Sequence, residues 1–151
     1  MKNLLLIFTI LFSCLTNNQE KVRNDNIFNI QTTITNYYDG YINRDINKLN
    51  KAFDTVNGTM KVPVIENEKI IGFKNVYFKE LMPIWGNREK LNPKVLENCS
   101  LEILTIDIVD NKIASAKISM KVDKTTYIDI LSLHKINDDW KITNKIYVSK
   151  E

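Results

Sequence analysis

The chain has 151 residues, of which 44% are hydrophobic and 26% charged, which is ordinary for one soluble globular domain with a real core. The net charge of +3 is mild and the lysines are scattered, so the dense basic footprint of a nucleic-acid-binding protein is excluded. No phosphate loop, dinucleotide fingerprint, nucleophile elbow or zinc signature occurs. The sequence therefore predicts neither a cofactor nor a metal.

The N-terminus is typical of an export signal. A positive start at Lys2 precedes an apolar run, residues 4–12, that is too short to span a bilayer. The run ends in Leu11-Phe12-Ser13-Cys14, which resembles a bacterial lipobox. We expect a signal peptide over 1–13, a lipidated Cys14 with a polar tether over 14–26, and a domain over 27–151 in the bacterial cell envelope. Soluble secretion after nearby cleavage and an uncleaved anchor remain alternatives.

Helical periodicity begins after the tether. Apolar residues at three- and four-residue steps predict a helix over 27–42, with Asp25 or Asn26 as its cap. The stripe consists of Ile27, Ile30, Ile34, Tyr37, Tyr38 and Tyr41. Gly40 lies inside that pattern and predicts the close approach of another element. Asp45 is the expected cap of a second, short helix that buries Leu49 and Phe53.

The middle of the chain is less regular. Asn57-Gly58 predicts a turn before a strand over 59–65, and residues 66–68 predict another turn. Apolar spacing then predicts a helix from Phe73 to Trp85 that Pro83 distorts or ends. Residues 86–100 read as polar and irregular.

From Leu101 onward the apolar period changes to two. Turns at 110–111, 123–124 and 137–138 divide this part into a four-stranded antiparallel meander, so the predicted fold class is α+β. Counting across the turns predicts which side chains share the face that carries Trp140. That set is Leu101, Ile103, Thr105, Asp107, Ala114, Ala116, Ile118, Met120, Tyr127, Asp129, Leu131, Leu133, Trp140, Ile142, Asn144 and Ile146.

The opposite face carries His134 and an isoleucine cluster. A face this apolar predicts a homodimer interface formed by two sheets. A different partner chain on the same face is the alternative, in which the protein would act as an interaction module.

Two stretches resemble the nuclear transport factor 2-like superfamily, which has the cystatin-like α+β cone. They are Tyr38-Asp39-Gly40-Tyr41 with Asp45, Leu49 and Phe53, and Tyr127-Ile128-Asp129 with Leu133, Lys135, Trp140-Lys141-Ile142 and Asn144-Lys145. Within it the chain looks most like the "putative lumazine-binding" group of secreted and lipoprotein contexts. The resemblance implies helices packed on the concave face of a curved sheet, a pocket between them, and frequent dimers. Ketosteroid isomerase-like and SnoaL-like enzymes are relatives, as are non-catalytic binding modules.

The concave face is the predicted site, because Ala114 and Ala116 leave room above the sheet. Asp129 is the main candidate, since a carboxylate on an apolar face needs a partner or a task. It could act as a general base with Tyr38 as oxyanion donor, or it could only fix the fold through hydrogen bonds. The predicted ligand-binding residues are Tyr38, Tyr41, Phe53, Trp85, Thr105, Asp129 and Asn144.

Two functions are compatible with this set. The leading hypothesis is a lipid-anchored, dimeric, non-catalytic module that binds a small, flat, partly aromatic ligand. It rests on aromatic and amide groups without a complete acid/base pair. The alternative is an isomerase, cyclase or dehydratase of the ketosteroid isomerase-like or SnoaL-like type that uses Asp129 as its base.

Overall fold

The computed structural model describes the backbone of residues 2–151 and the side chains of residues 20–151. The predicted lipobox and Cys14 fall outside the described side chains. Within the part whose side chains are described, no helix is long and apolar enough to cross a membrane. The elements are α1 (Lys2–Asn43), α2 (Ile46–Ala52), β1 (Thr59–Glu66), β2 (Lys69–Tyr77), α3 (Phe78–Gly86), α4 (Pro93–Leu96), β3 (Ser100–Val109), β4 (Ile113–Val122), β5 (Thr125–Ile136) and β6 (Asp139–Lys150).

The predicted start of the first helix is wrong, because α1 already includes the residues before Ile27. Residues 20–26 are polar apart from Val22 but contain neither glycine nor proline, so nothing in them ends a helix. Asn26 is not a cap but a buried contact: its side-chain oxygen accepts from Trp140 Nε1 at 3.0 Å. Its amide donates to the side-chain oxygen of Asn111 at 3.2 Å. Asn26 thus ties α1 to β6 and to the β3–β4 turn.

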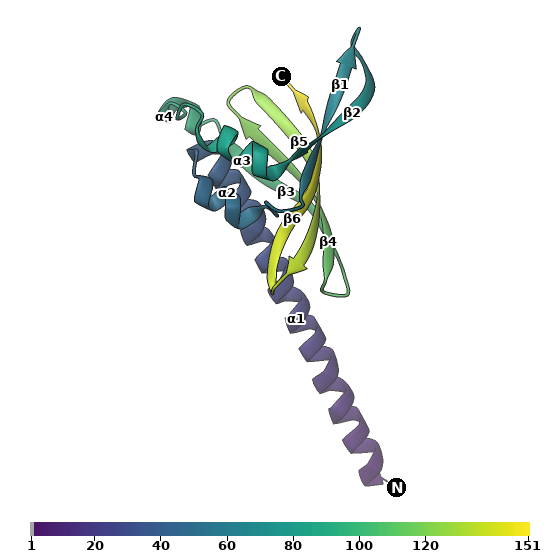
Figure 1. Ribbon diagram of the computed structural model, residues 1–151. Coiled ribbons are helices and arrows are strands. Elements are labelled where there is room, and N and C mark those ends of the chain that lie inside the picture. Colours follow the sequence, from purple (N-terminus) through teal and green to yellow (C-terminus); the bar gives the residue numbers. More distant parts are fainter. Residues whose placement is uncertain (1) are drawn as a thin grey trace.

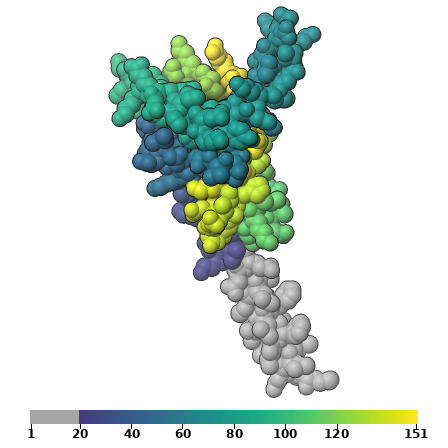
Figure 2. Space-filling view, viewed as in Figure 1, coloured from purple at the N-terminus to yellow at the C-terminus, as the bar shows by residue number. Residues whose placement is uncertain are grey.

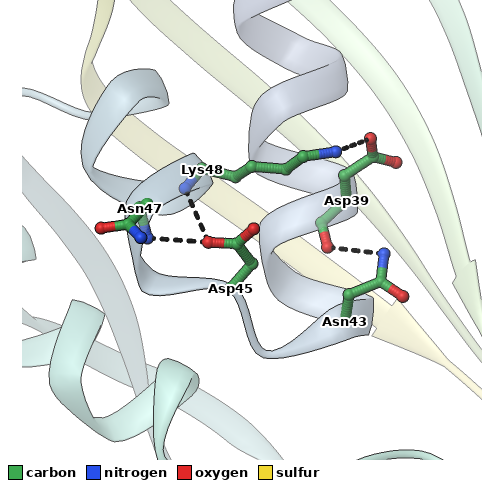
Figure 3. A network of polar contacts seen from close by, with 5 residues as sticks. All are labelled: Asp39, Asn43, Asp45, Asn47 and Lys48. Atoms are coloured by element: carbon green, nitrogen blue, oxygen red, sulfur yellow. Dashed lines mark hydrogen bonds and ion pairs between the residues drawn. The ribbon is translucent and has the colours of Figure 1, made fainter.

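The junction between α1 and α2 follows the prediction (Figure 3). Asp45 caps α2, since its Oδ1 accepts from the backbone N–H groups of Asn47 and Lys48 at 2.9 and 3.2 Å. Lys48 also forms an ion pair with Asp39 of α1, with Nζ and Oδ2 2.6 Å apart. The cap and the ion pair fold α2 back along α1, and Gly40 lies buried at their contact.

The predicted helix from Phe73 to Trp85 is wrong in its first part and confirmed in its second. Residues 69–77 form the strand β2, which pairs with β1, and only residues 78–86 are helical as α3. Asn67 and Glu68 both have positive φ, which joins the two strands in a tight hairpin. The tip of this hairpin stands clear of the body in Figures 1 and 2. Phe73, in the middle of β2, is 63% exposed. The helical spacing of apolar residues in β2 therefore does not indicate a buried helix face.

The sheet has six strands in the order β2-β1-β6-β5-β4-β3. The last four form the predicted antiparallel meander, and Asp110, Asn111, Asp123, Asn137 and Asp138 in its turns all have positive φ. β1 joins β6 in parallel over only two residue pairs. The helices α1, α2 and α3 lie on one side of this curved sheet, as Figure 1 shows. The core fills the space between the helices and this concave face.

Two β-bulges correct the predicted register. A shift between Ile103 and Thr105 turns Thr105 and Asp107 outward and brings Ile106 and Ile108 against the core. A second shift, beside Ser132 and Leu133, turns Asn144 and Ile146 outward. Lys145 and Tyr147 take their places on the concave face. Each bulge inserts one residue, so all side chains beyond it change face.

Trp140 and Asp129 remain on the same, helix-covered face, with exposed fractions of 2% and 0%. The opposite, outer face of the sheet carries exposed apolar side chains, and the second bulge adds Ile146 to them. We call this set the outer apolar face: Leu104, Ile113, Ile130, Ile146 and Val148.

Candidate functional site

A pocket of about 270 Å³ lies between α1, α3 and the concave face of the sheet. Tyrosines from α1, β5 and β6 contribute much of its wall, and α3 supplies aliphatic side chains and a tryptophan. The lining residues are Tyr37, Tyr41, Met60, Val62, Leu81, Ile84, Trp85, Arg88, Met120, Tyr127, Lys145 and Tyr147.

Lys145 and Tyr37 form the polar floor of the pocket, and they belong to a buried group of three side chains that Asp129 completes from below. Lys145 Nζ donates to Asp129 Oδ2 in an ion pair, and also to the Tyr37 hydroxyl oxygen at 2.7 Å. The Tyr37 hydroxyl donates to the same Asp129 oxygen at 2.9 Å. Asp129 Oδ1 is buried and has no partner among the described residues. Each of the three groups thus contacts the other two.

Burial governs the ionisation of this group. It lowers the pKa of Lys145, although Asp129 acts in the opposite direction. Burial and the Asp129 charge both raise the pKa of Tyr37 well above its ordinary value. Near neutral pH Tyr37 is therefore a neutral hydroxyl that donates to Asp129 and accepts from Lys145.

Aromatic rings make the wall next to this floor. Tyr37 is stacked near Trp85, with ring centroids 6.2 Å apart, and meets Phe53 edge-on at 4.9 Å. Tyr41 meets Trp85 edge-on at 5.3 Å. The rings hold one another in place, which gives the pocket a preformed apolar side.

The predicted site residues divide into groups. Tyr41 and Trp85 line the pocket. Phe53 is buried behind Tyr37 as core, and Tyr38 is half-buried and does not line the pocket. Asp129 is fully buried under Lys145 and does not line the pocket either.

The bulges remove the other two predicted residues from the concave face. Thr105 is exposed and pairs with Lys117 on the outer side of the sheet. Asn144 pairs with Ser132, and its amide donates to the Thr59 carbonyl and hydroxyl oxygens at 3.2 and 3.1 Å. Asn144 therefore helps to hold β1 against β6.

Sequence reasoning missed Tyr37, Arg88, Lys145 and Tyr147 as site residues, and it placed Tyr127 on the right face without assigning it to the site. Tyr37 belongs to the predicted apolar stripe of α1, so its burial was foreseeable but its polar role was not. Lys145 and Tyr147 were assigned to the wrong face because no turn residue marks the bulge before them. Arg88 follows α3, in a stretch predicted to be irregular.

The arrangement favours binding. Two charged donors, Lys145 and Arg88, and several tyrosine rings surround a space just below the roughly 300–1,000 Å³ of pockets for drug-sized ligands. The carboxylate that could abstract a proton is covered by its own partners. The pocket thus offers hydrogen-bond donors and aromatic rings to a small molecule.

Solved structures agree with this fold. A nuclear transport factor 2-like protein from Shewanella baltica is 21% identical, with a TM-score of 0.68 over 83% of this chain and 94% of its own. One from Methylobacillus flagellatus is 20% identical, with a TM-score of 0.66 over 84% and 94%. A ketosteroid isomerase-like protein from Erwinia carotovora is 12% identical, with a TM-score of 0.54 over 81% and 94%. No curated protein matches the sequence.

The family comparison covers most of the chain. Residues 25–148 match the model of the family described as "Putative lumazine-binding", and they include every element from the end of α1 to most of β6. The chain therefore belongs to the putative lumazine-binding family, within the nuclear transport factor 2-like fold.

Proposed function

We propose that this protein is a non-catalytic module that binds a small, flat, partly aromatic molecule in the pocket between α1, α3 and the sheet. The observation that carries the proposal is the lining itself: stacked aromatic rings on one side and the Lys145 amine in the floor. Aromatic walls with few polar groups are the usual composition of small-molecule sites. The family's name is in accord with such a ligand.

The position of Asp129 argues against the catalytic alternative. A general base must come within hydrogen-bond reach of the proton it removes. Asp129 is 0% exposed, does not line the pocket, and already accepts from Lys145 and Tyr37. The ketosteroid isomerase-like hypothesis would need this group to open, so binding without chemistry is the better account.

A calorimetric screen of heteroaromatic metabolites would test the binding. Val62 lines the pocket from β1, whereas Val64, two residues further along the same strand, does not line it and is exposed. Val62→Trp should fill the pocket and abolish binding of any hit, and the matched control Val64→Trp should leave it unchanged. Absence of any ligand at millimolar concentration, or equal loss in both variants, would count against the proposal.

We further propose that the domain is held at the bacterial cell envelope through a lipid on Cys14. The support is the lipobox-like Leu11-Phe12-Ser13-Cys14 after a short apolar run. Expression in a bacterial host with a labelled fatty acid should label the wild type and not Cys14→Ser. Labelling of both, or of neither, would contradict the anchor.

The last part of the proposal is a homodimer through the outer apolar face. Leu104, Ile130, Ile146 and Val148 are each between 39% and 54% exposed on a single chain, which is unusual for an uncovered sheet face. Ile130→Lys should convert the dimer to a monomer in light scattering. A wild-type protein that is already a stable monomer would refute self-association and favour a different partner on that face.

A further inference from the structure

The pocket has an unbalanced positive charge at its mouth. Two cations, Lys145 and Arg88, line it, and no aspartate or glutamate does. The charge of Lys145 is already compensated by Asp129 beneath it. The charge of Arg88 has no such partner, because no ion pair involves it among the residues whose side chains are described.

Arg88 is fixed against the aromatic wall rather than free in solution. Its Nη1 donates to the Tyr41 hydroxyl oxygen at 2.9 Å, and its guanidinium carbon lies 5.7 Å from the centre of the Tyr41 ring. A second guanidinium, that of Arg44, lies 5.3 Å from the same ring. Tyr41 therefore has two like charges beside it.

Arg44 is held beside Arg88 by hydrogen bonds, so the repulsion between the two guanidinium groups remains. Its Nε donates to the Glu89 backbone carbonyl, and another of its N–H groups donates to the Tyr41 carbonyl, so it is held in place. Burial lowers the pKa of Arg44, and the neighbouring Arg88 charge lowers it further. No ion pair of Arg44 exists in the described part of the chain. Arg88, which lines the pocket, and Arg44, beside the same tyrosine ring, are thus two positive charges without an ion pair among the described side chains, an arrangement that favours an anion.

The floor of the pocket also offers a hydrogen-bond donor that has no acceptor among the described residues. Lys145 Nζ has three hydrogens and uses two of them, toward Asp129 and Tyr37. Because the amine is buried, an acceptor oxygen or ring nitrogen of a ligand would satisfy the third. A planar molecule with one acidic group and one acceptor could bind Arg88 at the mouth and Lys145 in the floor.

We infer that the natural ligand is a small aromatic anion, of the carboxylate class, whose acid group binds at Arg88 and whose ring lies among Tyr37, Tyr41 and Trp85. This inference rests on the proposed binding function and adds the charge of the ligand to it. The carboxylate goes to Arg88 rather than Lys145, since only Arg88 offers an unbalanced charge and a bidentate donor pair.

The test compares naphthoate with naphthamide, which carries a neutral amide at the same ring position, by calorimetry on the folded protein. Naphthoate should bind about tenfold or more tightly than naphthamide, the ratio that one charge-assisted hydrogen bond supplies, and this preference should shrink as salt is added. Arg88→Gln should remove the preference and Arg88→Lys should restore part of it. Lys90→Gln, an exposed lysine two residues along, is the matched control and should change nothing.

The outcomes separate the two proposals. Equal binding of acid and amide, or a preference that survives in Arg88→Gln, would overturn the anionic ligand while leaving a working pocket. Failure of both compounds to bind, together with an empty metabolite screen, would overturn the pocket proposal itself. Loss of the preference in Lys90→Gln as well would assign it to general surface charge and also overturn the inference.

Discussion

Lys145 and Asp129 form their ion pair diagonally across two neighbouring strands, since Asp129 pairs with Tyr147 and Lys145 pairs with Leu131. Both side chains are almost completely buried, so loss of either partner leaves the other charge poorly compensated. This contact joins β5 to β6 under the pocket, and it exists only because the bulge beside Ser132 and Leu133 moves Lys145 to the concave face.

The first prediction concerns this pair. Asp129→Leu and Lys145→Met should each lower the free energy of unfolding by about 3–5 kcal/mol, because each leaves one buried charge uncompensated. The double variant replaces both charges with apolar groups and should lose much less than the sum. Urea unfolding measures all four proteins. Additive losses in the double variant would show that the two side chains do not depend on each other.

The second prediction separates two adjacent tyrosines. Tyr37→Phe keeps the ring contacts with Phe53 but removes the hydroxyl that donates to Asp129 and accepts from Lys145. It should cost about 1–3 kcal/mol in urea unfolding, the penalty for leaving buried polar groups unsatisfied. Tyr38→Phe is the control, because Tyr38 is half-buried and its hydroxyl lies outside the group of three. Equal costs would contradict the special role of Tyr37.

These residues also show how far the sequence could predict the site. The helical spacing placed Ile30, Ile34 and Tyr37 on one buried stripe, and Asp45 was the expected cap. The turn at 137–138 fixed the strand pairing, and counting residue pairs from it placed both Trp140 and Asp129 on the concave face. These features depend on local chemistry, namely side-chain period, capping oxygens and residues that tolerate positive φ.

The remainder depends on contacts that no short stretch encodes. A bulge adds one residue to a strand without a distinctive sequence, so Lys145 and Tyr147 were assigned to the wrong face. In β2, Phe73, Val76 and Tyr77 satisfy helical spacing, yet Phe73 and Tyr77 remain exposed on the β1–β2 hairpin. Pairing with β1 overrides their period.

The third prediction is an alkaline loss of stability. The pKa of Tyr37 is raised in the folded protein by burial and by Asp129, so its stabilising effect is complete below pH 10.0 and is lost as the pH rises from there toward the folded-state pKa. The lowered pKa of Lys145 acts with the opposite sign, because the unfolded chain keeps that proton up to its ordinary value of 10.5. Tyr37 must therefore be isolated by substitution.

Urea unfolding of the wild type and Tyr37→Phe, from about pH 8 to about pH 11, measures the difference between them. The wild type should lose stability more steeply than the variant above about pH 10, so the two curves should converge. Spectrophotometric titration of tyrosinate should show one fewer late-ionising tyrosine in the variant. Parallel stability curves would contradict the assignment of the alkaline loss to Tyr37.

The fourth prediction tests the contact between α1 and α2. A methyl group on Gly40 would lie 2.8 Å from the backbone nitrogen of Leu49 and 2.9 Å from its Cγ, whereas one on Gly72 would meet no atom within 4 Å. Alanine is the better helix former by about 1 kcal/mol, so propensity alone predicts that Gly40→Ala stabilises the protein. Because the neighbour is the backbone of Leu49, whose N–H donates to the Asp45 carbonyl, we expect overpacking to prevail and to cost about 1–3 kcal/mol. Thermal and urea unfolding should place Gly40→Ala below the wild type and leave Gly72→Ala close to it; a more stable Gly40→Ala would mean that α2 can move away without loss.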